Sequence, residues 1–208
     1  MHLNFDILQA INLARSRLDL MKVQDVLELA ERDNLIFDPF SVLISKQVKI
    51  GNNNIFYPCV TLVRKDDFEL AIGDRNIFHT GTMIAAELGP VTIGNANQFG
   101  EGGFTAKANR SGAWINIGDN GRYLGGASVF GQTDLGSGSQ LLGMIMVDSC
   151  RLGAGESFSG SNPDKRGSLL KGAGTARNLH LNVGEVIQGN GSFLIENLKL
   201  QSTFHAKA

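Results

Sequence analysis

Two groups of cationic side chains in this sequence could bind an anionic substrate. Lys107 and Arg110 lie in the longest interruption of a six-residue repeat, and Lys165 and Arg166 lie in the turn-rich segment SGSNPDKRG. Ammonium and guanidinium groups bind phosphate or carboxylate through charge-assisted hydrogen bonds. Lys107 and Arg110 are therefore candidate substrate-binding residues. A solvated loop is the plainer interpretation of both groups, since exposed cations are common on any protein surface.

Histidine is the side chain whose charge changes near neutral pH, so histidines are the usual residues for proton chemistry. The sequence has four of them: His2, His79, His180 and His205. His79 follows Phe78, an inward position of the repeat, and we predict its side chain on the outer surface. An ordinary polar surface residue and a reactive residue both fit that position.

The composition predicts a globular protein and excludes several functional classes. The chain has 208 residues, of which 42% are apolar and 19% charged, and its formal net charge is −1. It has no clustered basic excess for nucleic acid, no polybasic run for a membrane surface and no apolar run long enough to cross a bilayer. Cys59 and Cys150 stand too far apart for a metal-ligand motif and do not make a disulfide framework. With no secretory pattern at the N-terminus, we expect a reducing cytoplasm.

Glycine recurs at intervals and reveals the repeat that must position these side chains. An aliphatic residue followed by Gly occurs at Ile50, Ile72, Ile93, Ile117, Leu135 and Leu152. Steps of six from the first five of these starts give fifteen positions, of which fourteen are large and apolar and the remaining one is Thr105. A six-residue period is typical of a β-helix, whereas a glycine-rich β-sandwich would show a period of two.

The repeat predicts an all-β fold, a left-handed parallel β-helix over residues 35–158. Three hexads make a coil of about 18 residues, and one side chain per hexad stacks on its equivalent in the next coil at a strand spacing of about 4.8 Å. Gly after the inward residue relieves crowding at the corner, and the Gly-Asn and Gly-Asp steps there suit a positive φ. Extra residues at 64–69, 87–90 and 107–113 are predicted to form loops.

The two ends of the chain depart from the repeat. Residues 1–34 are predicted to be a helical segment, with Asp6 and Gln9 as a capping pair and Ile7 to Leu18 carrying one apolar stripe. We expect this segment to cap the exposed edge of the β-helix, and the alternative is a docking helix for a partner. Residues 159–208 are predicted to be a C-terminal loop and cap.

The hexads from Ile50 to Leu152 resemble the bacterial hexapeptide-repeat transferase superfamily, which contains acyltransferases, γ-class carbonic anhydrases and non-catalytic relatives. Residues 70–94 (LAIGDRNIFHTGTMIAAELGPVTIG) look like the β-helical subunits of the dynactin pointed-end complex, which are scaffolds. The segment DNLIFDPFSVLISKQVKIG is similar to the approach to the acetyltransferase domain of bifunctional N-acetylglucosamine-1-phosphate uridylyltransferases.

The superfamily resemblance implies a homotrimer with sites between subunits and an acetyl-CoA or other acyl thioester co-substrate that is not tightly bound. It implies His79 as the general base, with His180 as the second candidate. The usual C-terminal Gly-Asn-Pro-Ala-type turn is missing, and residues 189–191 match it only in part. Only His79 lies in the repeats and the paired histidines of the carbonic anhydrases are absent, so we expect no metal and no such activity.

Two functions follow from these resemblances. The first is an acyltransferase that acts on a small hydroxyl or amine acceptor at subunit interfaces. The second is a non-catalytic scaffold that contacts a protein partner through the flat faces of the β-helix. The sequence predicts no nucleic-acid partner and no membrane partner for either function.

Overall fold

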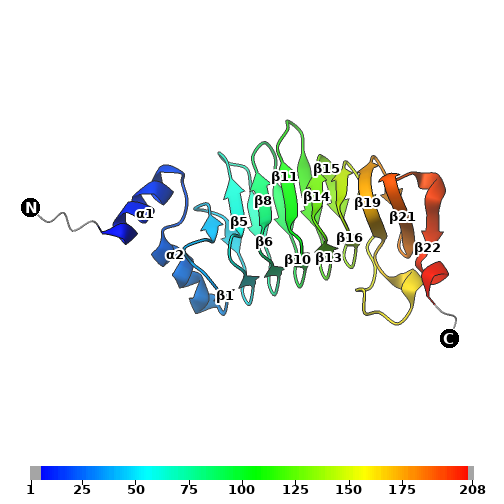
Figure 1. Cartoon of the computed structure of the whole chain (residues 1–208), viewed down its shortest axis with the longest axis horizontal. Helices are drawn as coiled ribbons and strands as arrows, with labels where there is room; N and C mark the ends of the chain where they lie inside the picture. The colour runs from blue at the N-terminus through cyan, green and yellow to red at the C-terminus, as the bar shows by residue number, and fades with distance from the viewer. Residues whose placement is uncertain (1–5, 206–208) are drawn as a thin grey trace, which may run out of the picture.

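The computed structural model describes residues 6–205 and shows a parallel β-helix, in which strands of successive coils stack along one axis (Figure 1). Each strand pairs in parallel with the equivalent strand of the next coil, as where Ile50 lies opposite Ile72. This confirms the all-β parallel β-helix with a helical N-terminal cap. The left-handed sense of the coiling stays a prediction.

The coils have three faces, each a ladder of parallel strands. The first face consists of β1 (Leu35–Ile36), β4 (Ile55–Phe56), β7 (Ile77–Phe78), β10 (Gln98–Gly100), β13 (Arg122–Leu124) and β16 (Gln140–Leu142). The second face consists of β2 (Leu43–Ile44), β5 (Thr61–Arg64), β8 (Thr82–Ala86), β11 (Phe104–Ala108), β14 (Ala127–Phe130) and β17 (Ile145–Asp148). The third face consists of β3 (Lys49–Ile50), β6 (Leu70–Ile72), β9 (Val91–Ile93), β12 (Trp114–Ile117), β15 (Gln132–Leu135), β18 (Arg151–Leu152) and β20 (His180–Leu181).

The inward positions of the repeat form one continuous core. All fourteen large apolar residues on the six-residue period are buried. The rings of Phe56, Phe78, Phe99 and Tyr123 stack coil on coil, with centroids 5.1, 5.1 and 5.4 Å apart. The predicted inward position at Thr105 is wrong, because Ala106 is buried and pairs with Ile84 and Val129. An extra residue in the Gly102–Gly103 corner moves the register by one.

A ladder of buried asparagines, Asn54, Asn76 and Asn97, closes the corners after the first three Ile-Gly pairs. Asn76 accepts a hydrogen bond from the backbone N–H of Asn97 at 3.0 Å and donates from Nδ2 to the Gly94 carbonyl at 2.9 Å. Gly73 is needed for space, because a Cβ there would lie 2.7 Å from the carbonyl oxygen of Gly94. The positive φ stands two residues later, at Arg75 (57°). The prediction of crowding is thus confirmed, and the place predicted for the positive φ is wrong.

The parallel pairing continues beyond residue 158, where the repeat predicts its end. Strand β19 (Leu169–Arg177) passes through a corner and pairs with both β16 and β17, and β21 (Glu185–Ser192) pairs with β19. The six-residue signal fades there because the segment 153–168 leaves the coil as a loop that contains the 3₁₀ turn η2 (Pro163–Lys165). The edge of β21 is covered by antiparallel β22 (Leu198–Leu200), with η3 (Ile195–Asn197) before it and η4 (Gln201–Phe204) after it.

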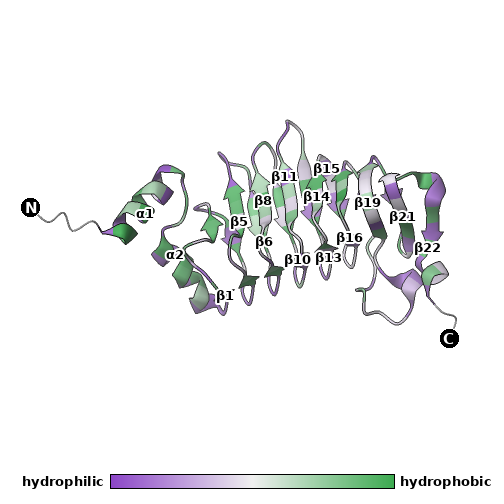
Figure 2. Cartoon of the chain, viewed as in Figure 1, coloured by the Kyte–Doolittle hydropathy of each residue, from purple (hydrophilic) through white to green (hydrophobic). Residues whose placement is uncertain are grey.

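The N-terminal segment forms α1 (Ile7–Arg17), α2 (Val23–Glu28) and η1 (Leu29–Arg32). The Asp6 side chain accepts from the backbone N–H of Gln9 at 3.2 Å, as the capping pair predicts. Val23 and Val26 of α2 are buried, and Val26 belongs to the same apolar core as the inward residues of the coils. The apolar stripe of α1 stays on the surface, with Ile7 67% and Leu18 71% exposed, and Figure 2 shows this apolar character of α1. Among residues 6–205, no helix is long and apolar enough to cross a membrane.

Candidate functional site

His79 lies on the outer surface directly after β7, as predicted from its place beside inward Phe78. Its imidazole stacks on the ring of Tyr57, with centroids 4.7 Å apart, and Tyr57 in turn contacts Phe37 at 4.8 Å. We call Phe37, Tyr57 and His79 the outer aromatic column. The equivalent residue of the next coil is Gly100, and a Cβ there would collide with the Cβ of His79. The glycine therefore lets the next coil pack closely against His79.

The other predicted site residues lie elsewhere on the molecule. Lys107 is on β11 of the second face, and the exposed His180 is on β20 of the third face, so neither shares a face with His79. Arg110 lies in the loop 109–113 and pairs with Asp148 of β17, its Nη1 lying 3.1 Å from the carboxylate Oδ2. The hydrogen bond with Arg110 lowers the pKa of Asp148 and raises that of Arg110. The structure thus does not bring these four residues together.

The surface around the outer aromatic column is apolar. The outward positions beside the inward residues of β1, β4 and β7 are Leu35, Ile55 and Ile77, and the aromatic column runs on the other side of the same strands. Phe37 is 54% exposed, and Phe40 in the following turn is 57% exposed. We call Leu35, Phe37, Phe40, Ile55, Tyr57 and Ile77 the outer apolar face.

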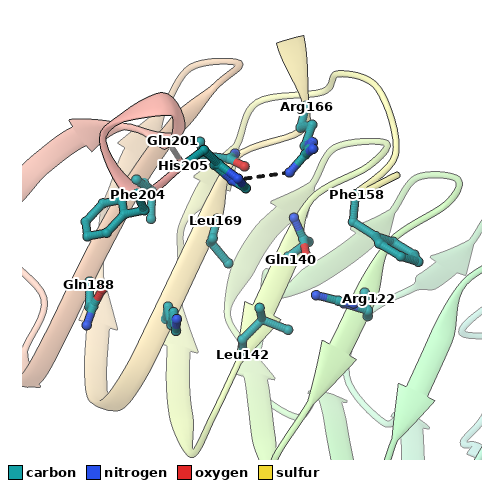
Figure 3. A pocket seen from close by; sticks show the side chains of 12 residues that line it. Arg122, Gln140, Leu142, Phe158, Arg166, Leu169, Gln188, Gln201, Phe204 and His205 are labelled. Atoms are coloured by element: carbon teal, nitrogen blue, oxygen red, sulfur yellow. Dashed lines mark hydrogen bonds between the residues drawn. The ribbon is translucent and has the colours of Figure 1, made fainter. Parts of the chain in front are cut away.

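A second feature, the C-terminal pocket, lies further along the stack. It is a cavity of about 210 Å³ whose lining residues are Arg122, Gln140, Leu142, Phe158, Arg166, Leu169, Lys171, Val186, Gln188, Gln201, Phe204 and His205. Outward residues of β13, β16, β19 and β21 form its floor, while the loop 153–168 and η4 form its sides. Figure 3 shows Arg122, Arg166, Gln140 and Phe158 around the same space.

Arg122 stands in an unusual environment within this pocket. Its guanidinium lies 4.3 Å from the centre of the Phe158 ring, and its Nε is buried with no hydrogen-bond acceptor among the described residues. Burial lowers the pKa of this guanidinium, and the charge of Glu101 raises it again in part. A buried donor without an acceptor costs free energy, so stability alone does not account for this arginine.

Arg166 is positioned by two contacts at the rim of the pocket. Its Nε donates to the carbonyl of Gly160 at 2.8 Å, and its Nη1 lies 3.4 Å from Nε2 of His205 (Figure 3). Gln201 of η4 donates to the carbonyl of Gly167 at 2.8 Å, which ties the C-terminal turn to the loop 153–168. The loop and the C-terminal turn therefore support each other around the cavity.

The pocket residues other than Arg166 were not singled out in the sequence. Arg122, Gln140 and Leu169 occupy one position on successive coils, directly before the inward residue. Three steps of six residues lead from Arg122 to Gln140, so the repeat could have predicted that these two residues are neighbours. Leu169 and the roofing residues Phe158 and His205 required the tertiary structure, because the loop 153–168 breaks the register.

Within the described part of the chain, no three His, Cys, Asp or Glu side chains are placed to hold a metal ion. Comparison of the sequence with known protein families and with curated proteins finds no match.

Proposed function

We propose that this chain is a β-helical assembly module that joins copies of itself through its outer apolar face. The observation that carries the proposal is the exposure of Phe37 and Phe40 beside half-buried Tyr57, on a ladder of paired strands. Large apolar side chains gathered on a rigid surface mark interaction sites, and aromatic residues dominate the energetics of such sites. The resemblance to hexapeptide-repeat proteins supports a trimer as the assembly.

A second copy of the chain is the occupant that best suits this face. The outward positions on β1, β4 and β7 carry no Asp, Glu, Lys or Arg, and Asp38 lies in the turn between Phe37 and Phe40, so the strands themselves offer no charge pattern that would select a charged partner. Most soluble oligomers consist of identical subunits related by a closed symmetry. An apolar face of repeated coils meets that requirement without a complementary patch on another protein.

Analytical ultracentrifugation of the full chain tests the assembly. We expect the wild type to sediment as a trimer and the double variant Phe37→Asp/Tyr57→Asp as a monomer, because two carboxylates would have to be buried at the interface. Met144→Asp is the matched control and should remain trimeric, because Met144 is an exposed apolar residue in the corner between β16 and β17, outside the outer apolar face. A wild-type chain that is monomeric at micromolar concentrations rules the proposal out.

The second candidate function is acyl transfer at a subunit interface, and the position of His79 favours it. His79 is half-buried and borders the outer apolar face through its stacking on Tyr57. In a trimer formed through that face, His79 would border the interface. As general base, His79 would take the proton of an acceptor hydroxyl or amine while the acceptor attacks the thioester carbonyl. The C–S bond then breaks, and the protonated His79 returns the proton to the leaving thiolate, so that the free thiol is released.

The acyltransferase is tested by incubating the trimer with acetyl-CoA and a panel of amine and hydroxyl acceptors, and by measuring thiol release. We expect His79→Ala to abolish release and His180→Ala to leave it unchanged, since His180 lies on the third face. Thiol release that survives His79→Ala contradicts the assigned base, and its absence with every acceptor leaves the assembly module as the function.

A further inference from the structure

The C-terminal pocket brings together cations that have no acidic partner in the pocket itself. Arg122, Arg166 and Lys171 line it, and every one of its twelve lining residues lies in the described part of the chain, with no Asp or Glu among them. Glu101, which acts on Arg122 through its charge, is outside the lining. The ion pairs found among residues 6–205 involve other cations, namely Lys46, Lys49, Arg64 and Arg110.

The protein holds two of these guanidinium groups in place without neutralising them. Arg122 is fixed by the ring of Phe158, and its buried Nε has no acceptor. Arg166 is fixed by the carbonyl of Gly160, at 2.8 Å from its Nε. Positive charges held close together repel each other, and an anionic group placed between them would remove that repulsion. An anion would also accept hydrogen bonds from the guanidinium N–H groups that have no other partner.

We propose that the C-terminal pocket binds a small molecule that carries a phosphate or carboxylate group on a flat apolar body, with Arg122, Arg166 and Lys171 as the anion-binding residues. Planar guanidinium groups match both oxyanions in a bidentate geometry. This binding activity goes beyond the proposed assembly and does not depend on it, since the outer apolar face is built on β1, β4 and β7 and the pocket on later coils.

The rest of the lining defines the body of the ligand. Phe158, Phe204, Leu142 and Leu169 give the cavity two aromatic rings and aliphatic walls, which suit a planar apolar group. Gln140 and Gln188 add amide groups for orientation. The cavity volume of about 210 Å³ lies below the roughly 300 to 1,000 Å³ of most ligand pockets, so the ligand is a small molecule and not a polymer segment.

Isothermal titration calorimetry of the full chain with four probes tests the proposal. The probes are phenyl phosphate, benzoate, inorganic phosphate and phenol, which separate the two anions from each other and from the ring. We expect phenyl phosphate or benzoate to bind more tightly than inorganic phosphate, and phenol not to bind. Added NaCl should weaken the binding, because it screens the attraction between ligand and cations.

Three variants assign the binding to this pocket. Arg122→Gln and Lys171→Gln should each weaken the better probe about tenfold or more, the effect of losing one charge-assisted hydrogen bond. Arg151→Gln, at an exposed arginine on β18 of the third face, is the matched control and should bind like the wild type. Circular dichroism confirms that each variant is folded, and Arg122→Lys, which keeps the charge, should retain part of the affinity if Arg122→Gln unfolds.

Several results would overturn the proposal. It fails if neither phenyl phosphate nor benzoate binds at millimolar concentrations, or if phenol binds as tightly as phenyl phosphate. It also fails if the folded Arg122→Gln and Lys171→Gln variants bind like the Arg151→Gln control. A binding site elsewhere would then account for any heat observed.

Discussion

Two arginines with lowered pKa values show how differently this chain uses the same side chain. Burial lowers the pKa of Arg15 and of Arg122, and one carboxylate near each raises it again in part, that of Asp38 and that of Glu101. Arg15 donates to four backbone carbonyls between α1 and the first coil, at 3.0 to 3.2 Å. Arg122 instead has a buried Nε without an acceptor. Arg15 therefore stabilises the cap, whereas the guanidinium of Arg122 lines the C-terminal pocket, which has no Asp or Glu in its lining.

The matched substitutions Arg15→Gln and Arg122→Gln should separate these roles. We expect Arg15→Gln to lower the free energy of unfolding by about 2–4 kcal/mol, since it leaves buried carbonyls without donors. Arg122→Gln loses a cation–π contact but also a partly buried charge, so its effect should stay within about 1 kcal/mol. Urea denaturation measures both. Equal losses in the two variants would show that Arg122 is also a structural residue.

At the scale of the strand, coil spacing is set by the glycines that follow the inward residues. Gly73 lies so close to the coil above that a Cβ would be 2.7 Å from the carbonyl oxygen of Gly94. We predict that Gly73→Ala lowers the free energy of unfolding by about 1–3 kcal/mol, the usual cost of overpacking.

Gly189 of β21 is the control for this prediction. A Cβ there would make only ordinary contacts, at 3.7 Å or more from the ring of Phe193. Gly189→Ala should leave the stability unchanged or raise it by up to about 1 kcal/mol, because Ala restricts the unfolded chain. If both alanine variants unfold at the same urea concentration as the wild type, the coil is more deformable than its spacing suggests.

The ion pair between Arg110 and Asp148 fastens the loop 109–113 to strand β17, and it should make stability depend on pH. The hydrogen bond from Arg110 lowers the pKa of Asp148 in the folded state. The pair therefore stabilises the fold above about pH 4, the ordinary pKa of Asp, and this contribution is lost as the pH falls through the lower folded pKa. Arg110→Gln should be less stable than the wild type at pH 7, and the difference should shrink below about pH 4. A difference that is the same at both pH values in urea denaturation would contradict this.

On the scale of the whole molecule, the stack is covered differently at its two ends. At the C-terminal end β22 covers β21, and at the N-terminal end α2 packs on the first coils while α1 keeps an exposed apolar stripe (Figure 1). The molecule thus has one covered end, and its first three coils carry one side with unburied apolar surface. That side, the outer apolar face, is where we expect copies to meet.

Assembly through this face makes thermal stability depend on protein concentration. A chain that is stabilised by binding further copies melts at a higher temperature when it is more concentrated. We predict this rise for the wild type and its loss in Phe37→Asp/Tyr57→Asp, measured by differential scanning calorimetry over a hundredfold range of concentration, about the range needed for a resolvable shift. A melting temperature of the wild type that is independent of concentration would contradict assembly.

The sequence alone determined the β-helix and its core, because a buried side chain at every sixth residue is a local periodicity that no other packing requires. Phe56, Phe78, Phe99 and Tyr123 stand in register in the sequence and stack in the structure. The error at Thr105 arose where one extra residue in a glycine corner shifted the register.

The candidate sites were decided by the tertiary structure. The sequence pointed to His79 on the outer surface, but it could not show that His180 and Lys107 lie on other faces, since the face depends on the summed length of all intervening loops. Arg122 and Arg166 come together only because the loop 153–168 folds back over strands β13, β16, β19 and β21. A six-residue period fixes which side chains point inward, and it carries no information on how residues outside the period fold over the surface.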